Sequence, residues 1–204
     1  MIIGKWNRSV IMTYFGMISA VVGIVFSIVL ENVNYAYACL MVSGVCDLFD
    51  GAIARKVERN EEEKAFGVQL DSLVDVVSFI ALPIAIFVSS GLRSLWFLPL
   101  FAVFAVSGIA RLAYFNILTA DSDAPVKYYT GLPVTYSALI FPLVNLLRYV
   151  ISSNIWFMVV YSVAIFAVSL LGVLRISVIK PKGIAYVFFG LLAIGMLVLY
   201  LVVL

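Results

Sequence analysis

Four aspartates stand in a short stretch of an otherwise apolar chain, at spacings that suit a shared site. Asp47 and Asp50 are three positions apart, and Asp71 and Asp75 are four apart. On helices, residues at these spacings share one face, so each pair can present its carboxylates in one direction. An ionisable residue inside a membrane-spanning segment costs about 2.5–3.5 kcal/mol on insertion scales, and such residues are functional-site candidates. We therefore expect the four acids to do chemistry.

The chemistry that these acids favour is metal-assisted transfer at phosphorus. Clustered carboxylates repel one another unless cations compensate their charge. The chain contains no His, which removes imidazole both as a metal ligand and as a general base. Oxygen-only ligation suits Mg²⁺ or Mn²⁺, with Ca²⁺ also possible. Two divalent cations sharing carboxylates would hold a diphosphate and stabilise the entering and leaving oxygens of a displacement.

The composition places these acids in a membrane protein. Of the 204 residues, 65% are hydrophobic and 12% charged, and the mean hydropathy is +1.17, which is too apolar for a soluble domain. We expect an all-α, polytopic membrane helical bundle of about six to eight transmembrane helices, forming a single domain over residues 1–204. The predicted spans are residues 10–30, 35–54, 67–89, 94–118, 131–150, 154–174 and 183–204.

The charges in the predicted loops fall mainly on one side of the membrane. That side would hold Lys5, Arg8, Arg55, Lys56, Arg59, Lys64, Lys127, Arg175, Lys180 and Lys182. The other side would hold Arg93 and Arg148. By the positive-inside rule, the amino terminus and the acidic region face the cytoplasm of a multi-pass protein in the cell membrane. The net charge of +2 is too small to indicate nucleic-acid binding.

The predicted topology brings the two acidic pairs to one mouth of the bundle. The second span runs toward the cytoplasm and the third runs back, joined by a predicted loop at 56–66. Asp50 would lie about 7.5 Å inside the helix end and Asp75 about 12 Å inside, at 1.5 Å per residue. Gly51 and Ala54 are small where a phosphate or ribose could approach, and Arg55 offers a planar donor for phosphate oxygens.

These residues resemble the signature of the CDP-alcohol phosphotransferase family, DxxDGxxAR followed by a spacer and GxxxDxxxD. The matching positions are Asp47, Asp50, Gly51, Ala54, Arg55, Gly67, Asp71 and Asp75. The spacer, residues 56–66, is eleven residues long, which is longer than the family's usual run. The resemblance implies a CDP-linked lipid donor, attack by a hydroxyl on its β-phosphorus, and CMP as the leaving group.

The resemblance also implies a role for each residue. Asp47, Asp50 and Asp71 would bind one metal and Asp50, Asp71 and Asp75 the other, and Asp75 would be the catalytic base. The CDP-binding residues would be Thr13, Gly51, Ala54, Arg55 and Gly67. A homodimer is the assembly that the family implies. The alternative is that the acids pair with Arg55, Lys56 and Arg59 as a solvated cluster at the helix ends.

Three further segments resemble the phosphatidylserine synthase branch of this family: DSLVDVVSF at 71–79, ARLAYFN at 110–116 and YTGLP at 129–133. Ile80 and Tyr114 depart from the branch's usual residues. Arg111 would lie about as deep as Asp75 and could bind the carboxylate of L-serine in a bidentate manner. Lys127 could contact phosphate or the amino acid. Alternatively, Arg111 only neutralises the acids and Lys127 is an interfacial lysine.

The expected function is transfer of a phosphatidyl or archaetidyl group from a CDP-lipid to L-serine in a lipid membrane, with release of CMP. An ester- or ether-linked donor fits equally well. Glycerol 3-phosphate or inositol phosphate is the alternative acceptor, although a dianion would need more cationic groups near Asp75. A cation transporter is the alternative from another class, but transporter sites usually lie near the midplane, whereas these acids cluster toward one mouth.

Overall fold

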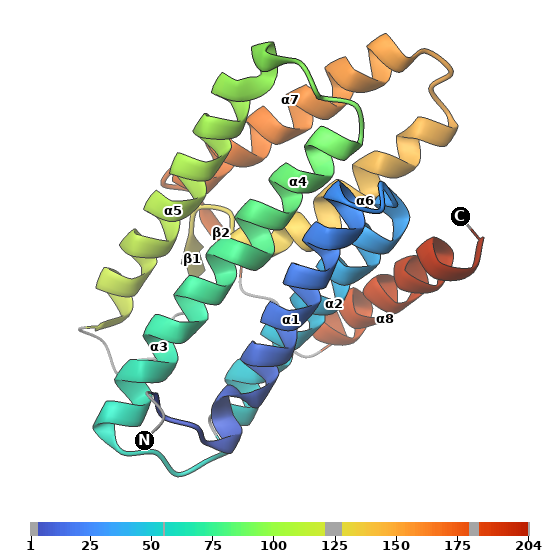
Figure 1. Cartoon of the computed structure of the whole chain (residues 1–204). Coiled ribbons are helices and arrows are strands. Elements are labelled where there is room, and N and C mark those ends of the chain that lie inside the picture. The colour runs from blue at the N-terminus through green and yellow to red at the C-terminus, as the bar shows by residue number, and fades with distance from the viewer. Residues whose placement is uncertain (1–3, 55, 121–127, 180–183, 204) are drawn as a thin grey trace.

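The computed structural model describes residues 4–54, 56–120, 128–179 and 184–203, which form an elongated bundle of helices (Figure 1). The helices are α1 (Ile11–Ile28), α2 (Val33–Ala54), α3 (Glu61–Val76), α4 (Leu82–Ser89), α5 (Leu98–Ala120), α6 (Ser137–Leu146), α7 (Asn154–Val173) and α8 (Ile184–Val198). Within the described residues, five helical stretches are long and apolar enough to cross a membrane, and Gly190–Val203 is a shorter apolar helix. The predicted all-α polytopic bundle is confirmed.

The third helix begins earlier than predicted, at Glu61 instead of residue 67. Asn60 accepts a hydrogen bond from the backbone N–H of Glu63, whose side chain accepts one from the backbone N–H of Asn60. This reciprocal capping box satisfies two N–H groups at the helix start, and the acids of the first turn suit the positive end of the helix dipole. The predicted loop at 56–66 is therefore half helical.

The helices α3 and α4 are joined into one rod by a π-helical turn at Val77–Ala81. Figure 1 shows this rod crossing the bundle, with α1 running beside it. The turn directly follows Asp75, the last acid of the signature. A π turn inside a helix shifts the register of the side chains on either side of it, and such turns often occur at functional sites.

The predicted span at 131–150 is shorter as a helix than expected. The α6 helix has ten residues and is flanked by 3₁₀ turns at Val134–Tyr136 and Leu147–Tyr149. Before it lies a feature that the sequence did not predict: the three-residue strands β1 (Tyr128–Thr130) and β2 (Ser177–Ile179) pair antiparallel. This ribbon fastens the segment before α6 to the segment after α7.

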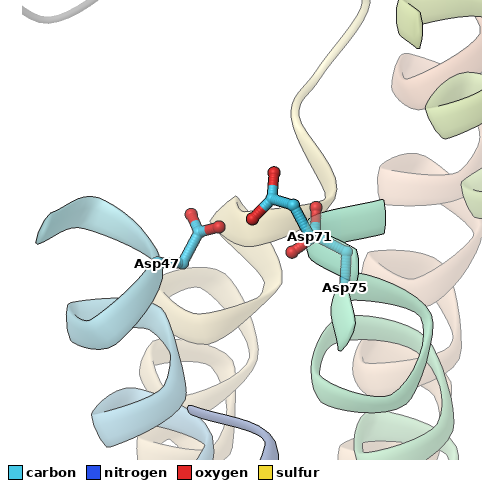
Figure 2. A group of neighbouring side chains, drawn as sticks. All are labelled: Asp47, Asp71 and Asp75. Carbon is cyan, nitrogen blue, oxygen red and sulfur yellow. The ribbon is translucent and has the colours of Figure 1, made fainter. Parts of the chain in front are cut away.

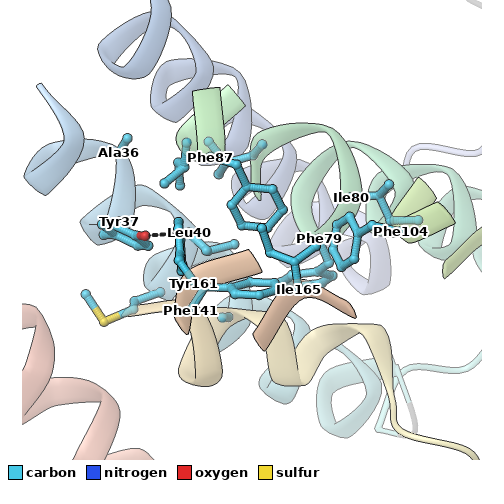
Figure 3. Packing of buried hydrophobic residues seen from close by; sticks show 14 of the residues in the cluster. Ala36, Tyr37, Leu40, Phe79, Ile80, Phe87, Phe104, Phe141, Tyr161 and Ile165 are labelled. Atoms are coloured by element: carbon cyan, nitrogen blue, oxygen red, sulfur yellow. Dashed lines mark hydrogen bonds between the residues drawn. The ribbon is translucent and has the colours of Figure 1, made fainter. Parts of the chain in front are cut away.

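An aromatic cluster holds the middle of the bundle together (Figure 3). Phe87 packs edge-to-face against Phe104, Phe141 and Tyr161, with ring centroids 4.7–5.4 Å apart. Such pairs contribute about 0.5–1.5 kcal/mol each beyond the area that they bury. The hydroxyls of Tyr37 and Tyr161 hydrogen-bond each other, so neither buried phenol lacks a partner. The cluster ties α2 and α7 to the α3–α4 rod.

Small residues let α1 approach α2 closely. A Cβ added to Gly23 would lie 2.8 Å from the Cβ of Cys39, so the backbones are too near for any larger residue there. Ser43 donates a hydrogen bond of 2.8 Å to the carbonyl of Gly16, and this bond links α2 to α1. Close contact through small residues and interhelical hydrogen bonds is typical of membrane helices. The consequence for the site is that Thr13 on α1 is held against α2.

Candidate active site

Three of the predicted acids meet across two helices. Figure 2 shows Asp47 on α2 pointing toward Asp71 and Asp75 on α3. One carboxylate oxygen from each residue lies within 4.8 Å of the others, and Asp75 is buried. The antiparallel course of α2 and α3 and the four-residue spacing on α3 are sufficient to produce this meeting. The acids that the sequence separates by more than twenty positions are therefore neighbours in space.

The fourth acid, Asp50, lies in the same cavity but has its own partner. Its Oδ2 accepts a hydrogen bond of 3.0 Å from the hydroxyl of Thr13. Its carboxylate also interacts with that of Asp71. The cavity is partly open to solvent and is lined by Thr13, Gly16, Ser43, Cys46, Asp47, Asp50, Asp71, Val74, Asp75, Ser78 and Phe79. All four signature acids therefore face one small space.

The residues of this cavity fit a divalent cation. Three carboxylate oxygens within 4.8 Å of one another repel strongly when ionised, and a hard cation with oxygen ligands offsets that repulsion. The hydroxyls of Thr13, Ser43 and Ser78 add only further oxygens to the lining. Cys46 contributes a single sulfur, too few soft ligands for a structural zinc site. The donor set therefore suits the ions predicted from the sequence.

Arg111 supplies positive charge beside the acids. It lies on α5 with 7% of its surface exposed, and it interacts electrostatically with Asp75 and Asp47. Its guanidinium also stacks over the ring of Phe115, 5.0 Å from the centroid. The side-chain amide of Asn116 donates a hydrogen bond of 2.7 Å to the hydroxyl of Ser72, which fastens α5 to α3 next to Asp71. This position is compatible with both predicted roles of Arg111.

The predicted nucleotide-binding residues are distributed around the end of α2 and the start of α3. Gly51 and Ala54 are half-buried on the last turns of α2. Gly67 lies inside α3, and a Cβ there would be 3.4 Å from Nη1 of Arg59. Its missing side chain thus leaves room for the guanidinium of Arg59. Arg55 and Lys127 lie outside the described residues.

The segment before α1 reaches across to the start of α3. Lys5 pairs with Glu62 at 2.7 Å, and this hydrogen bond raises the pKa of Lys5. Trp6 stacks on Tyr14 with ring centroids 4.9 Å apart. Because the ion pair is exposed, it contributes little stability. Its effect is to keep the amino-terminal segment near the helix ends that carry the acids.

The sequence predicts neither the partner of Thr13 nor the place of Ser78 in the lining. Thr13, which we expect at the nucleotide, donates a hydrogen bond from its hydroxyl to Asp50 in this structure. Ser78, in the segment DSLVDVVSF, is one of the residues that line the cavity. The spacing of Asp71, Asp75 and Ser78, at i, i+4 and i+7, is the signal that could have placed Ser78 on the same helix face.

Comparison with known proteins shows the family of the chain. Residues 6–174 match the CDP-alcohol phosphatidyltransferase family. The match includes all four acids, Arg111 and the whole of α1 to α7. The chain therefore belongs to the CDP-alcohol phosphatidyltransferase family.

Three similar proteins carry serine in their names. The CDP-diacylglycerol–serine O-phosphatidyltransferase of Methanocaldococcus jannaschii is 31% identical over 184 residues, which cover 90% of this chain and 79% of that protein. The Saccharomyces cerevisiae protein of the same name is 37% identical over 97 residues, covering 45% of this chain and 34% of the relative. The archaetidylserine synthase of Methanothermobacter thermautotrophicus is 33% identical over 110 residues, covering 53% and 45%. The last two matches thus span less than half of each relative.

Proposed function

We propose that this protein transfers a phosphatidyl or archaetidyl group from a CDP-linked lipid to the hydroxyl of L-serine and releases CMP. The observation that carries the proposal is the meeting of Asp47, Asp71 and Asp75 in one cavity with Arg111 beside them. The names of the relatives from M. jannaschii and S. cerevisiae support serine as the acceptor. The archaetidylserine synthase supports an ether-linked donor equally well.

The acids have distinct roles in this proposal. Asp47, Asp50 and Asp71 would hold one Mg²⁺ or Mn²⁺ ion and Asp50, Asp71 and Asp75 the other, with Ca²⁺ as a further possibility. Bound ions would neutralise the diphosphate and stabilise the entering and leaving oxygens. Thr13 orients Asp50 through its 3.0 Å hydrogen bond, which keeps a shared carboxylate in one rotamer. A fixed ligand loses less entropy when it binds an ion.

The transfer itself requires one proton acceptor and one leaving group. Asp75 takes the proton of the serine hydroxyl, and that oxygen forms a bond to the β-phosphorus of the donor. The bond between the β-phosphorus and the bridging oxygen breaks, so CMP leaves with that oxygen. Arg111 holds the serine carboxylate in a bidentate manner, which orients the hydroxyl toward Asp75. Gly51, Ala54 and Gly67 leave space for the nucleotide, Arg55 binds phosphate oxygens of the CDP group, and Lys127 binds phosphate or the amino acid.

The proposal also covers the domain organisation, the oligomeric state and the membrane orientation of the enzyme. The chain forms one domain over residues 1–204 and acts as a homodimer in the cell membrane, with its amino terminus and acidic cavity on the cytoplasmic side. The basic loops predicted on that side support this orientation by the positive-inside rule. The nucleotide end of a CDP-lipid is water-soluble, and so is free serine. Both properties suit a site near the mouth of the bundle.

An acceptor panel tests the proposal. Purified protein receives a CDP-lipid, Mg²⁺ or Mn²⁺, and one alcohol at a time: L-serine, glycerol 3-phosphate or inositol phosphate. The proposal predicts CMP release with L-serine well above the rate without acceptor. Faster release with a phosphorylated alcohol than with serine would overturn the serine assignment while leaving the family chemistry intact.

A further inference from the structure

Ser78 is a buried hydroxyl that the proposed mechanism does not use. Only 1% of its surface is exposed, and Ser78 is one of the residues that line the acidic cavity. Within the described residues, its Oγ has no hydrogen-bond partner. An unsatisfied buried hydroxyl costs about 1–3 kcal/mol. A bound ligand that hydrogen-bonds this hydroxyl would offset that cost.

The backbone around Ser78 is held so that the hydroxyl stays in the cavity. Ser78 lies in the π turn Val77–Ala81, three residues after Asp75. The hydroxyl of Ser137 on α6 donates a hydrogen bond of 3.3 Å to the carbonyl of Phe79, inside this turn. Because Ser137 is itself 1% exposed, this bond is shielded from water. A helix other than α3 thus fixes the register of the turn and the direction of Ser78.

The chemistry of the lining indicates what Ser78 would bind. Asp47, Asp71 and Asp75 can only accept hydrogen bonds when ionised, whereas a serine hydroxyl both donates and accepts. The hydroxyl lies about one helical turn beyond Asp75, away from the mouth of the cavity. The cavity is open on one side and lined by these polar groups, so a small polar molecule that enters from the mouth would approach Asp75 first and Ser78 next. An alcohol whose hydroxyl faces Asp75 would place its other polar group within reach of Ser78.

We infer that Ser78 is a positioning residue for the acceptor, hydrogen-bonding the polar end of the small alcohol while Asp75 faces its hydroxyl. The inference rests on the proposed transfer reaction and extends it to a residue outside the acidic signature. Ser78 acts on orientation and touches neither the diphosphate nor the metal ligands. Replacing Ser78 should therefore raise the KM for the acceptor and leave the KM for the CDP-lipid donor unchanged.

The experiment compares Ser78→Ala, Ser78→Thr and Ser90→Ala in the full-length protein. Ser90 is also 1% exposed and lies at the end of α4, about 18 Å further along the same rod at 1.5 Å per residue. Ser78→Ala should raise the acceptor KM about tenfold, the loss expected for one hydrogen bond to a charged group. The KM for CDP-lipid should stay at its wild-type value, and the melting temperature should not fall, because Ser78→Ala removes a buried hydroxyl that has no partner. Ser78→Thr, which keeps the hydroxyl, should recover most of the loss, and Ser90→Ala should behave as wild type.

The wild-type acceptor panel separates the two proposals. If the wild-type protein uses an alcohol other than serine, the Ser78 variants are measured with that alcohol, and the same acceptor-specific KM shift is expected. If wild-type protein releases no CMP with any alcohol, the transfer proposal and this inference both fail, and the wild-type assay alone reveals it. If the wild-type protein is active and the acceptor KM of Ser78→Ala is unchanged, this inference alone is overturned. An equal rise for donor and acceptor, with a lower melting temperature, would also overturn it.

Discussion

The hydroxyl of Thr13 on α1 donates a hydrogen bond of 3.0 Å to Oδ2 of Asp50 on α2, and both side chains are buried. This contact joins the packing of the first two helices to the acidic cavity. The small residues that bring α1 against α2 determine where Thr13 lies, and Thr13 determines how Asp50 is turned. A structural feature of the bundle thereby sets the geometry of a predicted metal ligand.

Replacing Thr13 by Val tests that relationship. Val has nearly the same shape but cannot donate, so Asp50 would lose its buried partner while the packing is kept. We expect kcat/KM to fall about tenfold, in line with the loss of one hydrogen bond to a charged group, and more Mg²⁺ to be needed for half-maximal CMP release. Thr13→Ser retains the hydroxyl and serves as the control. Identical metal titrations for Thr13→Val and wild type would show that the bond does not orient a ligand.

Metal dependence follows from the three carboxylates that meet within 4.8 Å. Excess chelator should abolish CMP release, and Mg²⁺ or Mn²⁺ should restore it. Asp71→Asn keeps the size of the side chain but removes a charge that both ions would share, so activity should fall by about a hundred- to a thousandfold, the scale on which single electrostatic stabilisers act. Full activity in excess chelator would contradict a metal-dependent site.

Acceptor recognition by Arg111 is tested by a change that keeps the charge. Arg111→Lys retains a cation beside Asp75 but loses the planar fork that binds a carboxylate in a bidentate manner. We expect a serine KM raised by about tenfold or more, with the CDP-lipid KM nearly unchanged. If Arg111 only neutralised the acids, Lys would replace it with little effect on serine. In that case Lys127 becomes the leading candidate for the serine carboxylate.

Replacing Gly131, in the segment that precedes α6, tests how closely that segment packs against Gly172. Gly131 has φ +75°, and a Cβ there would lie 2.4 Å from the carbonyl oxygen of Gly172. Gly131→Ala therefore combines backbone strain of about 1–3 kcal/mol with a backbone clash, and the melting temperature should fall by several degrees. Gly172→Ala is the matched control, because its added Cβ would meet only the carbonyl oxygen of Leu132, at 4.0 Å. Equal melting temperatures for both variants would contradict the described packing.

The sequence predicted the bundle and the meeting of the acids because both follow from short-range patterns. Apolar runs mark the spans, and the spacing of Asp71 and Asp75 places them on one helix face. The apolar run begins near Gly67 and so predicts too late a start for α3, whereas Asn60 and Glu63 carry a capping signal that marks the observed start.

Other features depend on contacts that no local pattern encodes. Thr13 and Asp50 are 37 positions apart, so their hydrogen bond depends on how α1 and α2 are rotated against each other. The strands β1 and β2 have three residues each, too few for an alternating pattern to be visible. The spacing from Asp71 and Asp75 indicates the helix face on which Ser78 lies, but only the structure shows that its hydroxyl is buried without a partner.

The central claim is tested most directly by following serine itself into lipid. Purified protein in detergent or vesicles is given radiolabelled L-serine, Mg²⁺ or Mn²⁺ and a CDP-lipid, and the label extracted with the lipid is compared with CMP released. The account predicts equal amounts of lipid-bound serine and CMP, both absent without CDP-lipid and both lost in Asp71→Asn. CMP release without lipid-bound serine, or label incorporation that survives in Asp71→Asn, would contradict it.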